Sequence, residues 1–375
     1  MKRALLVLML LLAATGALAA DNQAYLAILA ETTAHKTAGM PAMPEMPAGV
    51  SMPNLPELRA MLSGAPQRLL NVRLWSPGIA PADAFAYIIP PAGLKQGDRL
   101  NLEIYRPPTE TVEGGQPGPG PGAEAAQGFT IKIYWGSSET VRPGQPKIIR
   151  WEGLTPEQKA LMQKQANEAR GQSSYFYREN WTTTYWPTKT QPGKIAPDAS
   201  LVGNYALTTN YTGSVAIDAP STVNFLAPFE LTSPKLDRVV PLADPIRLVW
   251  KPIPTALGLH AAIFGMEGKN TLTLWSSSEV ETEGTMTDWG YLEMAKVLEL
   301  VKSTVMMKGD RTSATVPAGI FQNCDMASLS MVGYGPGTAL DQGQPLPRIQ
   351  TKTTLTVMLG GKSMPDMSGL GGPSE

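Results

Sequence analysis

The sequence predicts a mainly β protein made of two tandem, homologous, antiparallel β-sandwich modules. Each module carries one inserted α-helix, and a short helical and Met-Pro-rich arm precedes them. Three observations lead to this prediction: short segments of period-two alternation, frequent Gly and Pro between them, and sequence anchors that recur at nearly constant spacing. The chain has 375 residues with 36 Gly and 34 Pro, which favours strands joined by turns.

The composition excludes several classes of function. Lys and Arg number 31 against 32 Asp and Glu, a formal net charge of −1, so nothing favours nucleic acid or an anionic membrane as a partner. The only histidines are His35 and His260, and the only cysteine is Cys324. This excludes disulfide frameworks and Cys/His zinc sites. We expect no cofactor, because the sequence contains no P-loop and no G-x-G-x-x-G motif.

Residues 1–19 have the three parts of a signal peptide. Lys2 and Arg3 form a basic start, an apolar run follows, and small residues lie at the expected cleavage site. We therefore expect an exported protein, either periplasmic or secreted to the cell surface, with no transmembrane segment after cleavage. In an oxidising compartment Cys324 has no partner within the chain. We expect it to be a small buried residue in a strand; an intermolecular disulfide or a reactive thiol is the alternative.

Residues 20–65 are predicted to form an N-terminal arm. A short helix is expected over 21–36, capped by Asp21 and with Tyr25 on its apolar face. The Met-Pro pairs of 39–54 prevent regular structure, so the arm either links or docks elsewhere. The tail 361–375 is also expected to be irregular.

The first module is expected over 66–190 and the second over 200–360. In the first, strands are predicted at 68–75, 84–89, 99–106 and 129–135, with a flexible loop at 109–128 and a helix at 155–170. In the second, strands are predicted at 204–217, 222–231, 245–251, 259–265, 270–278, 312–317, 326–334 and 349–359. An amphipathic helix is predicted over 287–305, with Tyr291, Met294, Ala295, Leu298, Val301 and Val305 on one face.

Three pairs of anchors suggest an internal duplication. They are 80–81 with 219–220, 102–108 with 247–253, and 135–139 with 275–279. A shared order and nearly constant offset indicate a repeat of about 140 residues. Trp135 should then superpose on Trp275, and Tyr105 on Trp250.

The segment PIRLVWKPIPTALGLHAAIFG, extended to LTLWSSSEV, covers residues 245–280. It resembles fibronectin type III and related immunoglobulin-like modules, in which a strand Trp precedes a Pro-rich turn and a Gly step into the next strand. It departs from them at Leu259-His260, where Tyr is usual, and in the predicted helix 287–305. The resemblance implies a sandwich used for binding or scaffolding, and names no ligand.

Catalytic chemistry has two candidate forms. The sequence does not favour a His-based triad, because His35 lies in the arm and His260 in an alternating strand, and no G-x-S-x-G elbow is present. A pair of carboxylates among Glu139, Glu279, Glu281 and Glu283 would suffice for a polysaccharide hydrolase or lyase. The alternative is structural, with Ser137-Ser138 and Ser277-Ser278 hydrogen-bonding the loops that follow their strands.

The densest aromatic segment is YFYRENWTTTYW at 175–186. Its candidate ligand-binding residues are Tyr175, Tyr177, Trp181, Tyr185 and Trp186. The odd-numbered rings would share one face of a strand, where they could stack on sugar rings. A core or inter-module contact is the alternative. If the segment binds a glycan, Trp181→Ala should weaken binding by about 1–3 kcal/mol, by analogy with base–aromatic stacking.

Methionine recurs in the arm at Met40, Met43 and Met46. Thioethers are ligands that select Cu(I), so these residues are candidate metal ligands. Because each precedes Pro or lies in a Met-Pro repeat, a low-complexity spacer is the alternative.

Together these observations predict an exported, non-enzymatic binding, adhesive or cell-envelope scaffold protein. Its partner would be a glycan or an envelope protein, recognised through the aromatic cluster. A carboxylate-dependent polysaccharide hydrolase or lyase is the first alternative, and a periplasmic Cu(I)-binding protein is the second.

Overall fold

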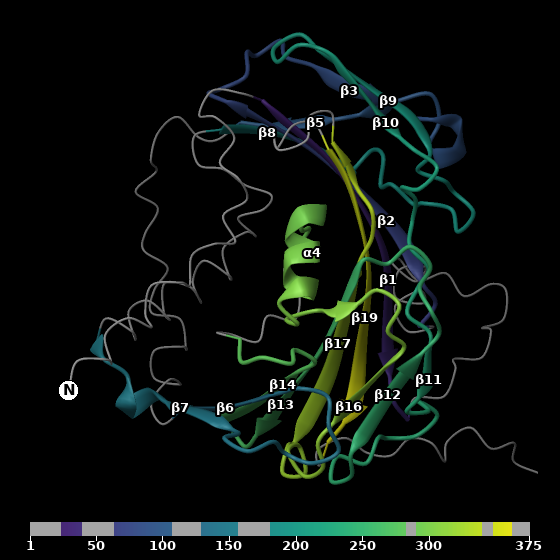
Figure 1. The fold of residues 1–375 in the computed structure, drawn as a ribbon. Coiled ribbons are helices and arrows are strands. Elements are labelled where there is room, and N and C mark those ends of the chain that lie inside the picture. Colours follow the sequence, from purple (N-terminus) through teal and green to yellow (C-terminus); the bar gives the residue numbers. More distant parts are fainter. Residues whose placement is uncertain are drawn as a thin grey trace, which may run out of the picture.

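The computed structural model describes residues 24–39, 64–106, 129–156, 181–282, 290–339 and 348–361. These residues form a mainly β structure with three sheets and, within the described ranges, one α-helix. Figure 1 shows a large sheet that curves around the helix, with two smaller sheets on its outer side. Within the described ranges, no helix has the length and apolar character needed to cross a membrane.

The large sheet has twelve strands. From edge to edge its main path is β5 (Glu103–Tyr105), β8 (Trp181–Trp186), β2 (Gln67–Pro77), β1 (Tyr25–Thr37), β19 (Arg348–Gly360), β17 (Met326–Tyr334), β13 (Gly258–Glu267), β14 (Thr271–Ser276), β6 (Thr130–Trp135) and β7 (Lys147–Arg150). The short strands β15 (Met307–Lys308) and β18 (Thr338–Ala339) pair with β13 and β19. Two neighbouring pairs are parallel, β1 with β19 and β14 with β6.

A four-stranded sheet covers one end of the outer face. Its order is β10 (Val215–Ala219), β9 (Gly203–Thr209), β3 (Ala86–Ile89) and β4 (Leu100–Asn101). Alternate residues of β1, among them Leu26 and Ile28, pack there against Ile88 and Leu207. This core holds one face of the small sheet and leaves its other face to solvent, as alternation along a strand requires.

A three-stranded sheet covers the other end of the outer face. Its order is β11 (Leu231–Ser233), β12 (Ile246–Trp250) and β16 (Ser313–Val316). Trp250 and Leu248 of β12 pack against Leu329 of β17 and Ile263 of β13 in a second core. Facing sheets that bury alternate residues in this way form a sandwich.

The helix α4 (Met294–Lys302) lies on the concave side of the large sheet (Figure 1). Val297 is its buried residue, and Val297 and Val301 lie over Gly258 of β13. A Cβ at Gly258 would stand 2.8 Å from Val301 and 2.9 Å from Val297, so the glycine permits this close approach. The predicted apolar face is wrong for Met294, Ala295 and Leu298, which are exposed. Apolar residues occupy more than one side of the helix, so its periodicity did not decide which side faces the sheet.

The predicted helix over 21–36 is also wrong, since these residues contribute β1. This strand pairs with β2 on one side and with β19 on the other, near the middle of the large sheet. Six consecutive residues from Tyr25 are buried. Burial on both faces removes the polar alternation that marks a strand, and long-range pairing outweighs the helix propensity of Ala, Leu and Glu. The described part of the arm is therefore core structure rather than a linker.

The predicted superposition of two modules fails at its anchors. Trp135 and Trp275 lie on adjacent parallel strands of the same sheet, where Trp135 pairs with Ser276. Tyr105 is exposed on the edge strand β5, whereas Trp250 is buried in the three-stranded sheet. Strands expected in the first module occupy both ends of the large sheet, so no boundary at 190–200 separates two sandwiches. The recurring anchors are short motifs near the ends of strands. Such motifs do not determine which strands pair, so their repetition does not imply a repeated fold.

Candidate ligand-binding surface

The outer face of the four-stranded sheet carries exposed apolar side chains. Along β3, Ala86 and Ile88 are buried in the core between the sheets, while Tyr87 and Ile89 face outward. Phe85, just before the strand, continues the outward row and is 48% exposed. A strand over an aqueous surface normally places polar residues on this side, so this row is unusual.

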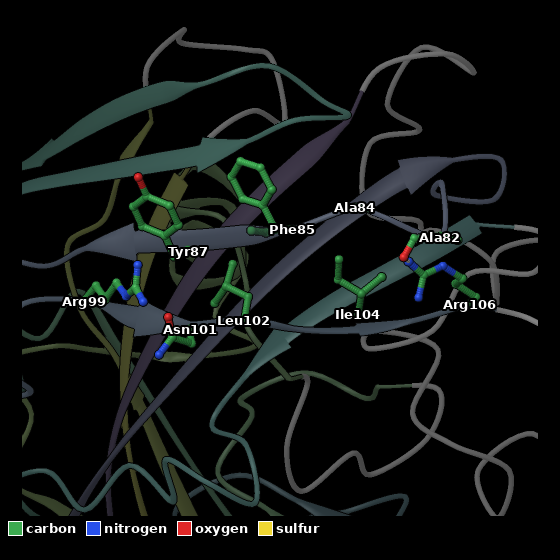
Figure 2. Close-up of a pocket in the computed structure, with 10 residues that line it drawn as sticks. Ala82, Ala84, Phe85, Tyr87, Arg99, Asn101, Leu102, Ile104 and Arg106 are labelled. Atoms are coloured by element: carbon green, nitrogen blue, oxygen red, sulfur yellow. The ribbon is translucent and has the colours of Figure 1, made fainter.

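A hollow of about 610 Å³ lies beside this row. Its lining consists of Ala82, Ala84, Phe85, Ala86, Tyr87, Arg99, Asn101, Leu102, Ile104 and Arg106. Figure 2 shows the rings of Phe85 and Tyr87 rising on the same side of β3. Their centroids are 6.3 Å apart and their planes differ by 15°, so the two rings are nearly parallel; we call this pair the aromatic platform.

Polar groups flank the platform on both neighbouring strands. Tyr87 pairs with Asn101 of β4 on one side and with Thr208 of β9 on the other. Residues directly opposite in a ladder point to the same face, so an amide and a hydroxyl lie on either side of the tyrosine ring. Gln191 holds β4 in place by accepting from the Asn101 backbone N–H at 2.7 Å.

Hydrogen bonds fix the backbone segment that leads into Phe85. The Phe85 backbone N–H donates to Asn210 at 2.9 Å, and the Asn210 amide donates to the Asp83 carbonyl at 3.1 Å. Arg106 donates to the carbonyls of Ala80 at 2.9 Å and Pro81 at 2.5 Å. The platform is thus positioned before any ligand arrives, which lowers the entropy lost on binding.

Arg99 completes the rim. Its guanidinium carbon lies 5.4 Å from the centre of the Tyr87 ring, within the range of a cation–π contact. Flat rings edged by an amide, a hydroxyl and a guanidinium suit a ligand with an apolar face and polar edges. The lining contains no Ser, Cys, His, Asp or Glu.

The aromatic residues selected from the sequence lie elsewhere. Tyr175 and Tyr177 fall outside the described residues. Trp181 and Tyr185 lie on one face of β8 and are partly exposed, whereas Trp186 points the opposite way and is 1% exposed. The shared face expected for odd-numbered rings is therefore seen for two of them. Trp186 belongs to the core under the four-stranded sheet, and it also lines a second hollow of about 310 Å³ beside Gln191 and Lys194.

Trp181 and Tyr185 face the concave side of the large sheet. Trp181 packs against a buried cluster that contains Tyr25, Trp75 and Tyr291. The Arg73 guanidinium carbon lies 5.6 Å from the centre of the Tyr185 ring. Burial, followed by a hydrogen bond with Glu103, raises the pKa of Tyr185.

Next to this cluster lies a network of buried charges. The Glu31 carboxylate accepts from Thr354 at 2.6 Å and from Tyr291 at 3.3 Å, and the Lys352 ammonium is 3.6 Å away. Lys352 also lies 4.5 Å from the centre of the Tyr291 ring. In the same way Arg348 pairs with Glu293 and stacks on Tyr25. These pairs tie the segment before α4 to β1 and β19, which is a structural role.

The carboxylates considered for hydrolysis are engaged in surface contacts or exposed. Glu279 pairs with Arg142 at 2.6 Å, and Glu281 pairs with Lys147. Glu139 is exposed, and Glu283 falls outside the described residues.

The hydrogen bonds expected at the Ser-Ser motifs are confirmed for the second serine of each motif, whereas Ser137 and Ser277 accept from the backbone N–H groups of Thr315 and Ala261. Ser138 donates to the Thr140 carbonyl at 2.7 Å, and Ser278 donates to the Val280 carbonyl at the same distance. The two motifs thus close equivalent turns after neighbouring parallel strands. This accounts for their repetition without a catalytic role.

The remaining candidates are buried or lie outside the described residues. His260 is buried in β13, and burial lowers its pKa to about 3, so it is neutral at physiological pH. Cys324 is buried as expected, in a turn before β17 rather than in a strand, and burial raises its pKa to about 11. Met40, Met43 and Met46 fall outside the described residues. Within those residues, no group of three or more His, Cys, Asp or Glu side chains is placed to hold a metal.

Sequence reasoning missed Phe85 and Tyr87, although a signal was present. The segment AFAYII at 84–89 has the length and residue types of a strand, yet both of its faces are apolar. One face packs on the core, and the apolar character of the other indicates a second contact. Neither a protein-family model nor a curated protein sequence matches this chain.

Proposed function

We propose that this protein is an exported binding protein that holds a glycan on the outer face of its four-stranded sheet. The observation that carries the proposal is the pair of nearly parallel rings, Phe85 and Tyr87, on an otherwise unpartnered sheet face. A sugar ring has an apolar face and hydroxyl edges, so it would cover an aromatic ring while its hydroxyls meet Asn101 and Thr208.

Two features support a binding role over a catalytic one. The platform is rigid, since backbone and side-chain hydrogen bonds hold Phe85, β4 and the loop at Arg106. The lining also lacks the paired carboxylates that glycoside hydrolysis requires. A preformed aromatic surface with polar edges and no acid–base pair suits retention of a polymer.

The sandwich itself also supports the proposal. The sheet β11–β12–β16 packs against β14–β13–β17–β19, and each of these strand pairs is antiparallel. The resemblance of residues 245–280 to fibronectin type III modules, which serve binding and scaffolding, favours the same kind of role. The predicted signal peptide would bring this surface to the polysaccharides of the cell envelope.

Affinity electrophoresis through gels containing neutral and acidic polysaccharides tests the proposal. The purified full-length mature protein should be retarded by at least one polymer. Phe85→Ala and Tyr87→Ala should each lose most of that retardation, because each removes one ring of the platform. Tyr105→Ala is the matched control, since this exposed tyrosine lies on β5 outside the hollow.

If no polymer retards the protein, or if both platform variants migrate as the wild type does, the platform is not a glycan site. Reducing ends released during the same incubation would instead support the hydrolase alternative. Circular dichroism of each variant establishes that lost retardation does not come from unfolding.

A further inference from the structure

We infer that the preferred glycan is acidic, and that Arg99 binds a carboxylate on a sugar stacked over Tyr87. The inference rests on the proposed function and narrows its ligand to polysaccharides that contain uronic acids. It follows from the charge of the hollow, the position of Arg99 and the hydrogen-bonding capacity that Arg99 keeps free.

The hollow is positively charged in a protein whose net charge is slightly negative. Its ten lining residues include Arg99 and Arg106 and no Asp or Glu. The nearest acids along the chain, Asp83, Asp98 and Glu103, do not line it. Glu103 lies opposite Tyr185 in the large sheet and hydrogen-bonds with it. An anionic group entering the hollow therefore meets two cations and no carboxylate among the lining side chains.

The two arginines have different roles. Arg106 uses its N–H groups on the backbone carbonyls of Ala80 and Pro81, and so builds the wall of the hollow. Arg99 is exposed, and its described contact is with the face of the Tyr87 ring. Figure 2 shows its guanidinium beside Tyr87 at the rim of the hollow.

The position of Arg99 fits a carboxylate. A guanidinium presents five N–H groups in one plane and binds a carboxylate through two parallel hydrogen bonds. Within the part of the chain that the structure describes, no side-chain hydrogen bond or ion pair occupies the Arg99 guanidinium. A sugar stacked on the face of Tyr87 that Arg99 does not cover would pair with that fork through an equatorial carboxylate that projects past the edge of the ring. A neutral hydroxymethyl group at this place would present one uncharged oxygen instead of the two charged oxygens of a carboxylate.

Paired polymers test this inference separately from the proposed function. Polygalacturonate and its methyl ester share one backbone and differ in the charge of the carboxyl group. Alginate and hyaluronan, each compared with its own ester, extend the comparison to other linkages. The proteins are the wild type, Arg99→Gln, Arg99→Lys and Tyr87→Ala, with Arg150→Gln as the control. Arg150 is an exposed arginine on the edge strand β7, so its loss changes net charge equally.

We expect at least one acid to bind about 2- to 5-fold more tightly than its ester, the range of one exposed charged pair. Arg99→Gln should abolish that preference and leave ester binding unchanged, and Arg99→Lys should keep part of it. High salt should weaken binding of the acid more than binding of the ester. Tyr87→Ala should weaken both forms, and Arg150→Gln neither.

Two failures are distinguishable. If esters and acids bind equally well and Arg99→Gln changes the affinity for neither, the inference that the ligand is an acidic glycan is wrong, while the proposal of glycan binding stands. If neither form of any polymer binds, the proposed function itself is wrong, and the inference falls with it.

Discussion

Replacing Glu31 by alanine should destabilise the protein by about 3 kcal/mol, because it leaves a buried ammonium without its carboxylate. The Lys352 side chain is 5% exposed and that of Glu31 is 16% exposed. The change removes a 2.6 Å hydrogen bond from Thr354 and the ionic contact with Lys352. Breaking a buried pair costs about 3–5 kcal/mol. We expect a cost at the lower end of this range, because the Glu31 side chain is partly exposed to solvent and Lys352 keeps its contact with the Tyr291 ring in the variant.

Urea unfolding at neutral pH, followed by circular dichroism, measures this cost. Glu31→Ala combined with Lys352→Met should be more stable than Glu31→Ala alone, because the second change removes the stranded charge. Glu299→Ala is the control. Its ion pair with Lys296 is on the surface, with Glu299 65% exposed, so its loss should cost no more than about 0.5 kcal/mol. A cost for Glu31→Ala as small as this control, or a double variant less stable than the single one, would refute the reasoning.

Three further perturbations test other parts of the fold. Gly258→Ala should cost about 1–3 kcal/mol in urea unfolding, because the new methyl group meets Val301 and Val297 at 2.8 and 2.9 Å; an unchanged midpoint would contradict the placement of α4. For His260, whose native pKa of about 3 lies below its unfolded value, stability is fully present above about pH 6.5 and falls as the pH drops toward 3. Urea midpoints from pH 7 to 4 should therefore fall more steeply for the wild type than for His260→Gln, and equal slopes would argue against a buried neutral histidine. Trp186→Ala should cost about 3–5 kcal/mol, whereas Trp186→Phe should bind glycan as the wild type does; loss of binding in a folded Trp186→Phe protein would place this ring at the ligand.

Local patterns predicted much of the strand content. The strands β2, β6, β13, β14, β17 and β19 lie within a few residues of their predicted segments. Alternation and β-branched residues mark these segments as strands, and β13, β17 and β19 are buried on both faces of the sheet. The Ser-Ser turns after β6 and β14 were also expected, because a serine hydroxyl satisfies a nearby carbonyl without help from distant residues.

Pairing between distant segments was not predictable in the same way. β1 looked helical because its residues are good helix formers, and only β2 and β19 on either side make it a strand. The parallel pairing of β14 with β6 depends on register across more than a hundred residues. Repeated motifs at strand ends therefore suggested a duplication that the sheet order does not contain.

The candidate site was only partly predictable. An exposed aromatic platform was expected, but it was sought where aromatic residues are densest in sequence. A high density of aromatic residues does not by itself indicate a binding site, because large rings also pack in protein cores. Trp186, which is 1% exposed, is an example. At Phe85 and Tyr87 exposure depends on which face of a small sheet the core uses, and that follows from the packing of β1 and β2 beneath it.

Hydroxyl-radical footprinting with and without the retained polysaccharide tests the central claim most directly. It measures, in the same sample, the solvent exposure of the platform and of the concave face. We predict that the glycan protects Phe85 and Tyr87 from oxidation and leaves Trp181, Tyr185 and Tyr105 unchanged. Protection of Trp181 and Tyr185 with no change at Phe85 and Tyr87 would contradict the account, and would move the site to the concave face of the large sheet.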